Sequence, residues 1–360
     1  MQATIPTNKF MVDTYGDWAV GEGIPIYEGF GLDLLTLETM PWPRFGVKGA
    51  IVHVAGRGDD MTVFILDIPP GGHTVQQRHL FEASLYVLAG QGITTFERAS
   101  GERGQFEWSA HSLFAPPLNM KYQIFNSSGR ENARIAMSCN LPAVLNLFHN
   151  EDFVFRNTAH FIDREGPQNH FLGEGDFIPI RPGKNMWETN FVPDCANLKL
   201  HAWNDRGRGA THIALILADS VMHAHISEIP VGTYKKAHRH GPDAHIYIVS
   251  GEGYSLLFNE GDKDFIRVDW KPGWIFAPPD MMFHQHFNTS GEPARYLAFL
   301  QGNIRYPLNA GRRRVYAGVD KDVKTGGNQI EYQDQDPRIH ETFVGELTRK
   351  GIALKMPASF

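Results

Sequence analysis

Cysteine is nearly absent from this sequence of 360 residues, which contains only Cys139 and Cys195. Two cysteines exclude a disulfide scaffold and supply too few thiolates for a zinc ribbon or an iron–sulfur cluster. An excess of basic charge is also missing, because 34 Lys and Arg residues stand against 40 Asp and Glu residues. With a net charge of −6 and no long basic run, the chain is not expected to bind nucleic acid.

Long apolar runs are missing as well. The first residues contain no positive segment followed by an apolar run, and no stretch approaches the roughly 20 apolar residues of a membrane span. We therefore expect no membrane association and a cytoplasmic location. The chain does have enough apolar residues, 42% of the total, for a large core in one or two domains.

Helical periodicity is scarce. It is clear only over 336–350, where Ile339, Phe343 and Leu347 form one apolar stripe and Gly351 follows as a stop signal. Short β-branched and aromatic runs separated by Gly and Pro are common instead. Examples are 62–68, 84–88 and 295–300. This pattern predicts many short antiparallel strands, and hence an all-β sandwich or barrel.

The strand pattern occurs twice, at an offset of 160 to 162 residues. Residues 85–92 match 246–253, for example, and the sequence Phe-Ala-Pro-Pro begins at both Phe114 and Phe276. Further matches join 68–72 to 229–232, 77–79 to 238–240 and 125–129 to 287–291. An ordered series of matches at a nearly constant offset indicates duplication of one structural unit.

Two histidine pairs in the second copy carry the chemistry. His238 and His240 are separated by one residue, and His284 and His286 follow with the same spacing. Alternate side chains of an extended segment point to one face, so the first pair and a histidine from a neighbouring strand can offer three nitrogen donors to a metal. Such a set suits Fe(II), Mn(II), Zn(II) or Ni(II) and leaves coordination positions open for substrate, water or dioxygen.

These residues resemble the two motifs of the cupin superfamily, and the duplication resembles a bicupin. Gly232, His238, His240 and Gly251 fit the first motif, with Ala244 at its usual Glu position. Pro279, His284 and Asn288 fit the second motif, with Met281 at its usual Gly position. The resemblance implies an all-β fold of two double-stranded β-helix (jelly-roll) barrels, with an N-terminal arm and a C-terminal helix.

On this basis we divide the chain into five parts. These are an N-terminal arm (1–41), an N-terminal cupin barrel (42–150), an inter-domain linker (151–202), a C-terminal cupin barrel (203–305) and a tail with one helix (306–360). The N-terminal barrel keeps only His79, with Gln77 and Tyr122 at the other ligand positions, so we interpret its metal site as degenerate. Arms and edge strands often pair between subunits, so a homodimer or higher homo-oligomer is expected.

The loss of the motif Glu makes the second barrel resemble gentisate and salicylate 1,2-dioxygenases. Those bicupins hold Fe(II) with three histidines and degrade aromatic compounds by cleaving the ring with dioxygen. The resemblance implies His238, His240 and His284 as metal ligands. Ile246 stands where these enzymes have an arginine that helps to bind the substrate carboxylate.

Further candidate residues follow from strand alternation. His286 shares the inner face with His284, and is either an acid/base near the metal or a core histidine. Ile246, Phe276 and Met282 are expected beside the metal, where they either contact an aromatic substrate or fill the barrel.

Three functions remain open from the sequence. The first hypothesis is a non-haem Fe(II)-dependent dioxygenase that cleaves a hydroxylated aromatic ring. The second is a redox-neutral hydrolase, lyase or isomerase that uses Mn, Zn or Ni on a small metabolite. The third is a non-enzymatic binding or storage protein. Oxygen-dependent turnover separates the first from the others.

Overall fold

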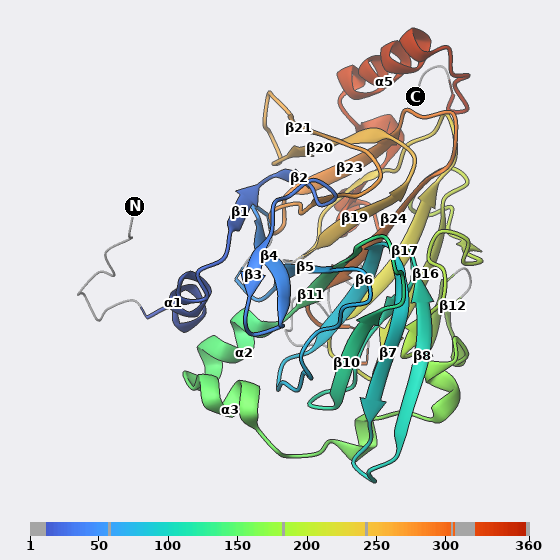
Figure 1. Ribbon diagram of the computed structural model, residues 1–360. Helices are drawn as coiled ribbons and strands as arrows, with labels where there is room; N and C mark the ends of the chain where they lie inside the picture. Colours follow the sequence, from blue (N-terminus) through green and yellow to red (C-terminus); the bar gives the residue numbers. More distant parts are fainter. Residues whose placement is uncertain are drawn as a thin grey trace.

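The computed structural model describes residues 12–56, 59–181, 184–241, 244–303, 305–306 and 321–357. Within these residues it is mostly β, with two large sheets and two smaller ones (Figure 1). The prediction of an all-β duplicated fold with a C-terminal helix is confirmed. No helix among the described residues is long and apolar enough to cross a membrane.

The first barrel is built from an eight-stranded sheet and a three-stranded sheet within the described residues. The larger sheet contains β1 (Ile26–Gly29), β3 (Met40–Trp42), β4 (Val47–Val54), β5 (Thr62–Ile68), β6 (Ala83–Ala89), β9 (Leu113–Phe114), β11 (Ala133–Cys139) and β14 (Phe191–Val192). The smaller sheet contains β7 (Gln91–Glu97), β8 (Arg103–Ser109) and β10 (Lys121–Asn126). Phe45, Phe64 and Leu66 lie in the apolar core of this barrel, each no more than 1% exposed.

The second barrel repeats this plan with a nine-stranded and a five-stranded sheet among the described residues. The larger sheet contains β2 (Gly31–Asp33), β12 (Asp176–Arg181), β13 (Lys184–Thr189), β15 (His201–Ala202), β16 (Thr211–Leu217), β17 (His223–Ile229), β19 (His245–Ser250), β22 (Trp274–Phe276) and β24 (Ala294–Leu300). The smaller sheet contains β18 (Ala237–His238), β20 (Gly253–Phe258), β21 (Ile266–Trp270), β23 (Phe283–Asn288) and β25 (Gln329–Ile330).

Equivalent residues of the two copies make equivalent contacts, which confirms the duplication in three dimensions. The amide of Asn126 donates to Ile68 O at 3.0 Å, and the amide of Asn288 donates to Ile229 O at 3.0 Å. In each copy a second contact from the same amide, 2.8 Å long, reaches the carbonyl of Glu131 or Glu292. These bonds satisfy buried carbonyl groups at the same turn of each barrel.

The two barrels exchange short strands. β1 pairs in parallel with β4 of the first barrel, whereas β2, two residues further on, pairs with β22 of the second. The segment between the barrels also pairs with both of them, in the opposite order: β13 pairs with β16 of the second barrel, and β14 then pairs with β9 of the first. Neither crossover was evident from the sequence, since strands of two to six residues carry little periodicity.

An apolar core lies between the barrels and includes side chains from both. Val63 and Tyr86 of the first barrel belong to one buried cluster with Tyr247 and Leu297 of the second. The rings of Tyr86 and Tyr247 lie 5.9 Å apart, and the Tyr247 hydroxyl is 2.6 Å from the Ser138 hydroxyl. The two large sheets therefore pack face to face as in a sandwich.

Helix α5 (Pro337–Lys350) confirms the predicted C-terminal helix. Ile339, Phe343 and Leu347 are each at most 1% exposed and pack on β20 and β23 (Figure 1). Asp336 caps the first turn by accepting from Arg338 N, and Gly351 ends the helix with a φ of 67°. Of the predicted tail, 307–320 and 358–360 lie outside the described residues.

Three short helices were not predicted: α1 (Thr14–Gly21), α2 (Leu141–Phe148) and α3 (Glu151–Arg156). Helices of six to eight residues depend on tertiary packing rather than on their own propensity, so their sequences carry a weak signal. Four 3₁₀ turns complete the described elements: Ile162–Arg164, Gln168–Phe171, Val323–Thr325 and Tyr332–Asp334.

Candidate metal centre

The structure brings His238, His240 and His284 together inside the second barrel. β18 and β23 are antiparallel neighbours that pair His238 directly with His284. His240 follows just after β18, and its carbonyl accepts from the backbone N–H of Met281 at 3.0 Å. One ring nitrogen from each histidine lies within 4.8 Å of the others, so this group is suited to hold a metal ion.

Each of the three rings is oriented by a backbone carbonyl. The Nδ1–H groups donate to Lys236 O for His238, Gly241 O for His240 and Met282 O for His284, at 3.0 to 3.1 Å. Because a carbonyl only accepts, these contacts place the proton on Nδ1 and leave the Nε2 lone pair for a metal. Burial lowers the pKa of His238 and of His284 well below the ordinary value, which keeps both rings neutral.

The Nε2 atoms of His240 and His284 lie only 3.1 Å apart. With both protons on Nδ1, two lone pairs face each other across this distance in a buried site. That arrangement is unfavourable unless a cation lies between the nitrogens. The donor set therefore fits a divalent metal, and it contains three neutral imidazoles and no carboxylate.

Met281 explains how the second motif works without its glycine. Its φ is 53°, and that of Asn119 at the same place in the first barrel is 59°. Both residues therefore keep the left-handed backbone that glycine normally supplies. The sequence showed only that Met281 replaces the glycine of the motif. The structure shows that the backbone turn at this position is retained.

His286 is buried beside the three histidines but is not one of them. Its ring centroid is 5.5 Å from that of His284, and its Nδ1 is 2.8 Å from the Ser255 hydroxyl. Ser255 also accepts from the Trp270 indole at 3.0 Å. A hydroxyl can donate to Nδ1 or accept from it, so Ser255 supports either tautomer of His286. Burial, with a smaller contribution from Lys235, lowers the pKa of His286 well below its ordinary value.

Sequence reasoning missed Ser255, although a signal existed. In the first barrel the Trp108 indole donates to the Thr94 hydroxyl at 3.1 Å, as the Trp270 indole donates to Ser255 in the second. Both copies therefore have a hydroxyl group that accepts from a tryptophan. The second copy differs because His286 is present beside that hydroxyl, whereas the first has Ile124 in its place.

The three predicted substrate-contacting residues form one apolar surface. Ile246 and Phe276 are directly paired across β19 and β22, and are 3% and 1% exposed. Met282 is partly buried against the same cluster. The ring of Phe276 is 5.8 Å from that of His286, so this surface adjoins the polar side of the site. A role in substrate contact stays a prediction.

The equivalent positions of the first barrel are joined to one another and to the backbone. Tyr122 donates to His79 Nε2 at 2.9 Å, and the His79 Nδ1–H donates to Phe81 O at 2.7 Å. The amide of Gln77 donates to the carbonyls of Arg44 and Val75, at 3.1 Å each. Both ring nitrogens of His79 therefore have protein partners, and burial lowers its pKa to about 4.

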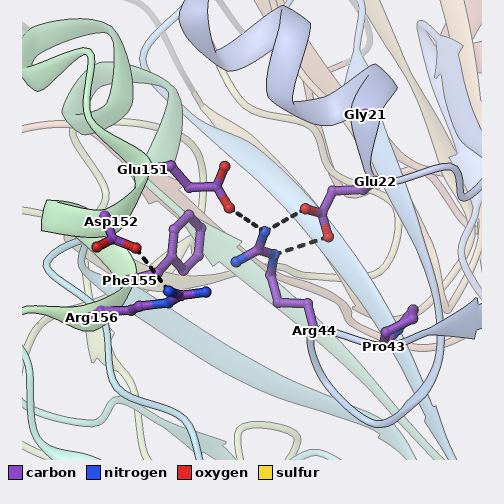
Figure 2. A pocket seen from close by; sticks show the side chains of 8 residues that line it. All are labelled: Gly21, Glu22, Pro43, Arg44, Glu151, Asp152, Phe155 and Arg156. Atoms are coloured by element: carbon purple, nitrogen blue, oxygen red, sulfur yellow. Dashed lines mark hydrogen bonds and ion pairs between the residues drawn. The ribbon is translucent and has the colours of Figure 1, made fainter.

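A surface pocket of about 370 Å³ lies elsewhere on the first barrel, where the N-terminal segment meets α3 (Figure 2). Arg44 points into it between Glu22 and Glu151, at 2.5 and 2.7 Å, and lies 4.1 Å from the Phe155 ring. Asp152 and Arg156 pair at 3.1 Å on its other wall. Its charged groups are paired with one another, so the pocket joins α1 and α3 to the barrel.

The fold and the site together define a duplicated double-stranded β-helix protein with a three-histidine candidate metal centre in its second half. The model of the auxin-binding protein family matches residues 37–164. The alignment with an auxin-binding protein of Nicotiana tabacum is 141 residues long at 26% identity, and it covers 36% of this chain and 74% of the tobacco protein. The family model matches mainly the first barrel, which lacks the three histidines.

Solved structures of oxalate decarboxylase share this fold, and two of those compared are of the Bacillus subtilis enzyme. Three of the solved structures give a TM-score of 0.50 at 11 to 12% identity, covering 76 to 77% of this chain and 77 to 78% of that chain. The chain thus has a bicupin-like fold, and its residues 37–164 are similar to the auxin-binding protein family. The comparisons do not support the finer prediction of closeness to gentisate and salicylate 1,2-dioxygenases.

Proposed function

We propose that the second barrel is a mononuclear metal centre of an enzyme that acts on a small molecule. The observation that carries this proposal is the set of buried His238 and His284 with partly buried His240. Every Nδ1–H of this set donates to a backbone carbonyl, and one ring nitrogen of each histidine lies within 4.8 Å of the others. Such preorganisation is typical of metal ligands and is not needed to fill a barrel. It argues against a purely structural or storage role.

As the particular reaction we propose Fe(II)-dependent cleavage of a hydroxylated aromatic ring by dioxygen. Bound Fe(II) would supply one-electron chemistry that joins substrate and dioxygen. Three neutral ligands leave the full dipositive charge of the metal uncompensated, which favours an anionic substrate. Ile246, Phe276 and Met282 would contact the ring, and His286 would carry a proton with Ser255 stabilising either tautomer.

A redox-neutral metal enzyme is the second candidate. Ile246 stands where the ring-cleaving enzymes have their carboxylate-binding arginine, and it is 3% exposed within an apolar cluster. Three imidazoles also accept Mn(II), Zn(II) or Ni(II). The solved structures that share the fold are those of a decarboxylase, and one describes Mn(II) centres in that enzyme. The second candidate is a hydrolase, lyase or isomerase of a small metabolite.

Metal content and oxygen uptake separate the two. The protein would be purified without oxygen, its metals quantified, and oxygen consumption measured with a panel of hydroxylated aromatic acids and phenols. About one iron per chain with substrate-dependent oxygen uptake supports the dioxygenase. Full occupancy by manganese, zinc or nickel without oxygen uptake supports the redox-neutral enzyme. A protein that binds no divalent metal contradicts both.

Two further predictions concern the assembly and its location. A homodimer or higher homo-oligomer stays a prediction, for which light scattering on the purified chain is the direct measurement. The cytoplasmic location likewise stays a prediction. The strands of the N-terminal segment, β1 and β2, pair with the barrels of their own chain.

A further inference from the structure

The interior of the second barrel contains a lysine that is completely buried. Lys235 is 0% exposed, and its Nζ donates to the Tyr296 hydroxyl at 2.8 Å. In the described part of the chain, no carboxylate forms an ion pair with this Nζ. A buried ammonium group without a counter-charge is strongly unfavourable, so a lysine at this place is costly unless an anion accompanies it.

The first barrel shows what folding alone requires at this position. Thr74 is the equivalent of Lys235, since their backbone N–H groups donate to the equivalent carbonyls of Ile124 and His286, at 2.9 and 3.0 Å. Ile135 is the equivalent of Tyr296, because Ile135 pairs with Leu66 as Tyr296 pairs with Ser227. A threonine and an isoleucine therefore suffice in the barrel that lacks the three histidines.

Two more positions are apolar in the first barrel and polar or charged in the second. Phe45 and Arg206 are equivalent, because each carbonyl accepts from the residue after Thr74 or Lys235, at 2.8 and 2.9 Å. Phe64 and His225 are equivalent in the strand pairing of β5 and β17. The first barrel has buried phenylalanines at these places, and the second has a guanidinium group that is 3% exposed and an imidazole. The second copy has cationic and hydrogen-bonding groups where the first has an apolar core.

These groups adjoin the candidate metal centre. The Lys235 Nζ is 4.7 Å from the Tyr296 ring centroid, and that ring is 5.4 Å from the ring of His286. The His286 ring in turn is 5.5 Å from that of His284. A continuous series of neighbouring side chains therefore connects the lysine to the metal ligands.

We propose that Lys235 and Tyr296 bind the carboxylate of a small organic acid whose other end reaches the three-histidine centre. The proposal rests on the proposed function, because it names the substrate class of the same site. Burial and the neighbouring Arg206 lower the pKa of Lys235 well below its ordinary value. A bound carboxylate would stabilise the ammonium form of Lys235, and the phenolic hydroxyl of Tyr296 would donate a hydrogen bond to that carboxylate. The bound carboxylate neutralises Lys235, as an acidic side chain would in an ordinary buried pair.

This assignment also resolves the role of Ile246. Ile246 stands where the ring-cleaving enzymes have their carboxylate-binding arginine, and Lys235, between β17 and β18, would take over that role. The substrate would present its carboxylate to Lys235 and its apolar part to Ile246 and Phe276.

The test measures binding by calorimetry to the full chain, both zinc-loaded and metal-free. The probes are benzoate, salicylate and oxalate, with uncharged benzamide and inorganic phosphate for comparison. We expect at least one carboxylate to bind the wild-type protein and benzamide to bind at least tenfold more weakly than benzoate. Lys235→Met should weaken the best carboxylate at least tenfold, and Tyr296→Phe should weaken it by a smaller factor. Lys121→Met, in the first barrel, is the matched control and should bind as the wild type does.

Each other result overturns the proposal. Absence of carboxylate binding, equal binding of benzamide and benzoate, preference for phosphate, or unchanged binding by both variants would each contradict it. Metal content, measured on the same samples, tests the proposed function separately. Lys235→Met protein that keeps its metal but loses the carboxylate supports both. Wild-type protein that takes up metal but binds no carboxylate contradicts only the substrate assignment.

Discussion

The Nε2 atoms of His240 and His284 face each other at 3.1 Å, each in a ring whose Nδ1 proton is directed to a backbone carbonyl. The distance is too short for two lone pairs without a positive charge between them. The same two rings are held by the turn that contains Met281, whose N–H donates to the His240 carbonyl. The first barrel keeps the same turn, since the Asn119 N–H donates to the His79 carbonyl at 3.1 Å, but it has Gln77 and Tyr122 where the second barrel has His238 and His284.

Replacement of His284 should abolish metal binding. His284→Ala removes one of three nitrogens, and the remaining two make a weaker site without a facial arrangement. We expect less than a tenth of the wild-type metal per chain, measured by elemental analysis after dialysis. His79→Gln, in the first barrel, should keep the wild-type metal content. Full metal content in His284→Ala protein would contradict the assignment.

His286 should affect turnover without affecting metal content. His286→Gln keeps a polar group beside Ser255 but cannot titrate, so kcat should fall by about 10²- to 10⁴-fold if the imidazole transfers a proton. Metal analysis and the pH profile of kcat are measured together. An unchanged kcat with an unchanged pH profile would show that His286 is only a core histidine.

The stability of the protein should fall in acid, partly because of His79. Burial lowers its pKa to about 4, from an ordinary value near 6.5. The unfolded chain takes up this proton near pH 6.5 and the folded chain only near pH 4. The contribution of neutral His79 is therefore complete above pH 6.5 and is lost as the pH falls toward 4, by about 3 kcal/mol in total.

Urea unfolding between pH 4 and pH 7, with a chelator present, measures this contribution. Other buried histidines add to the slope, so the comparison is between wild-type and His79→Gln protein. The variant should lose less stability on acidification, by about 1.4 kcal/mol per pH unit in this range. Identical slopes would contradict the prediction.

A methyl group at Gly251 should destabilise the second barrel. Gly251 has a φ of 76°, and an added Cβ would lie 2.6 Å from the Ala294 Cα. Gly251→Ala should therefore lower the free energy of unfolding by about 2 to 3 kcal/mol. Gly291→Ala is the control, because a Cβ there meets no atom within 4 Å, and it should change stability by less than about 0.5 kcal/mol. Equal effects of the two variants would contradict the prediction.

Particular elements show how far the sequence predicts this structure. The stripe of Ile339, Phe343 and Leu347 and the strand runs 62–68 and 295–300 were identified correctly, because each signal is local: the stripe has the period of a helix, and the runs are rich in β-branched and aromatic residues. The exchanged strands β1, β2, β13 and β14 were not identified. Their partners lie far away in the chain, and pairing over that distance depends on the assembled barrels rather than on local pattern.

The sequence by itself determined the duplication, the cupin motifs and the grouping of His238, His240 and His284, since alternation in a strand fixes which side chains share a face. Only the tertiary structure decided that backbone carbonyls hold the three Nδ1 protons, that Ser255 meets His286 and that Lys235 lies buried against Tyr296. The reason is physical. Spacing along one strand depends on backbone geometry alone, whereas contacts between strands depend on register, twist and packing of the whole barrel.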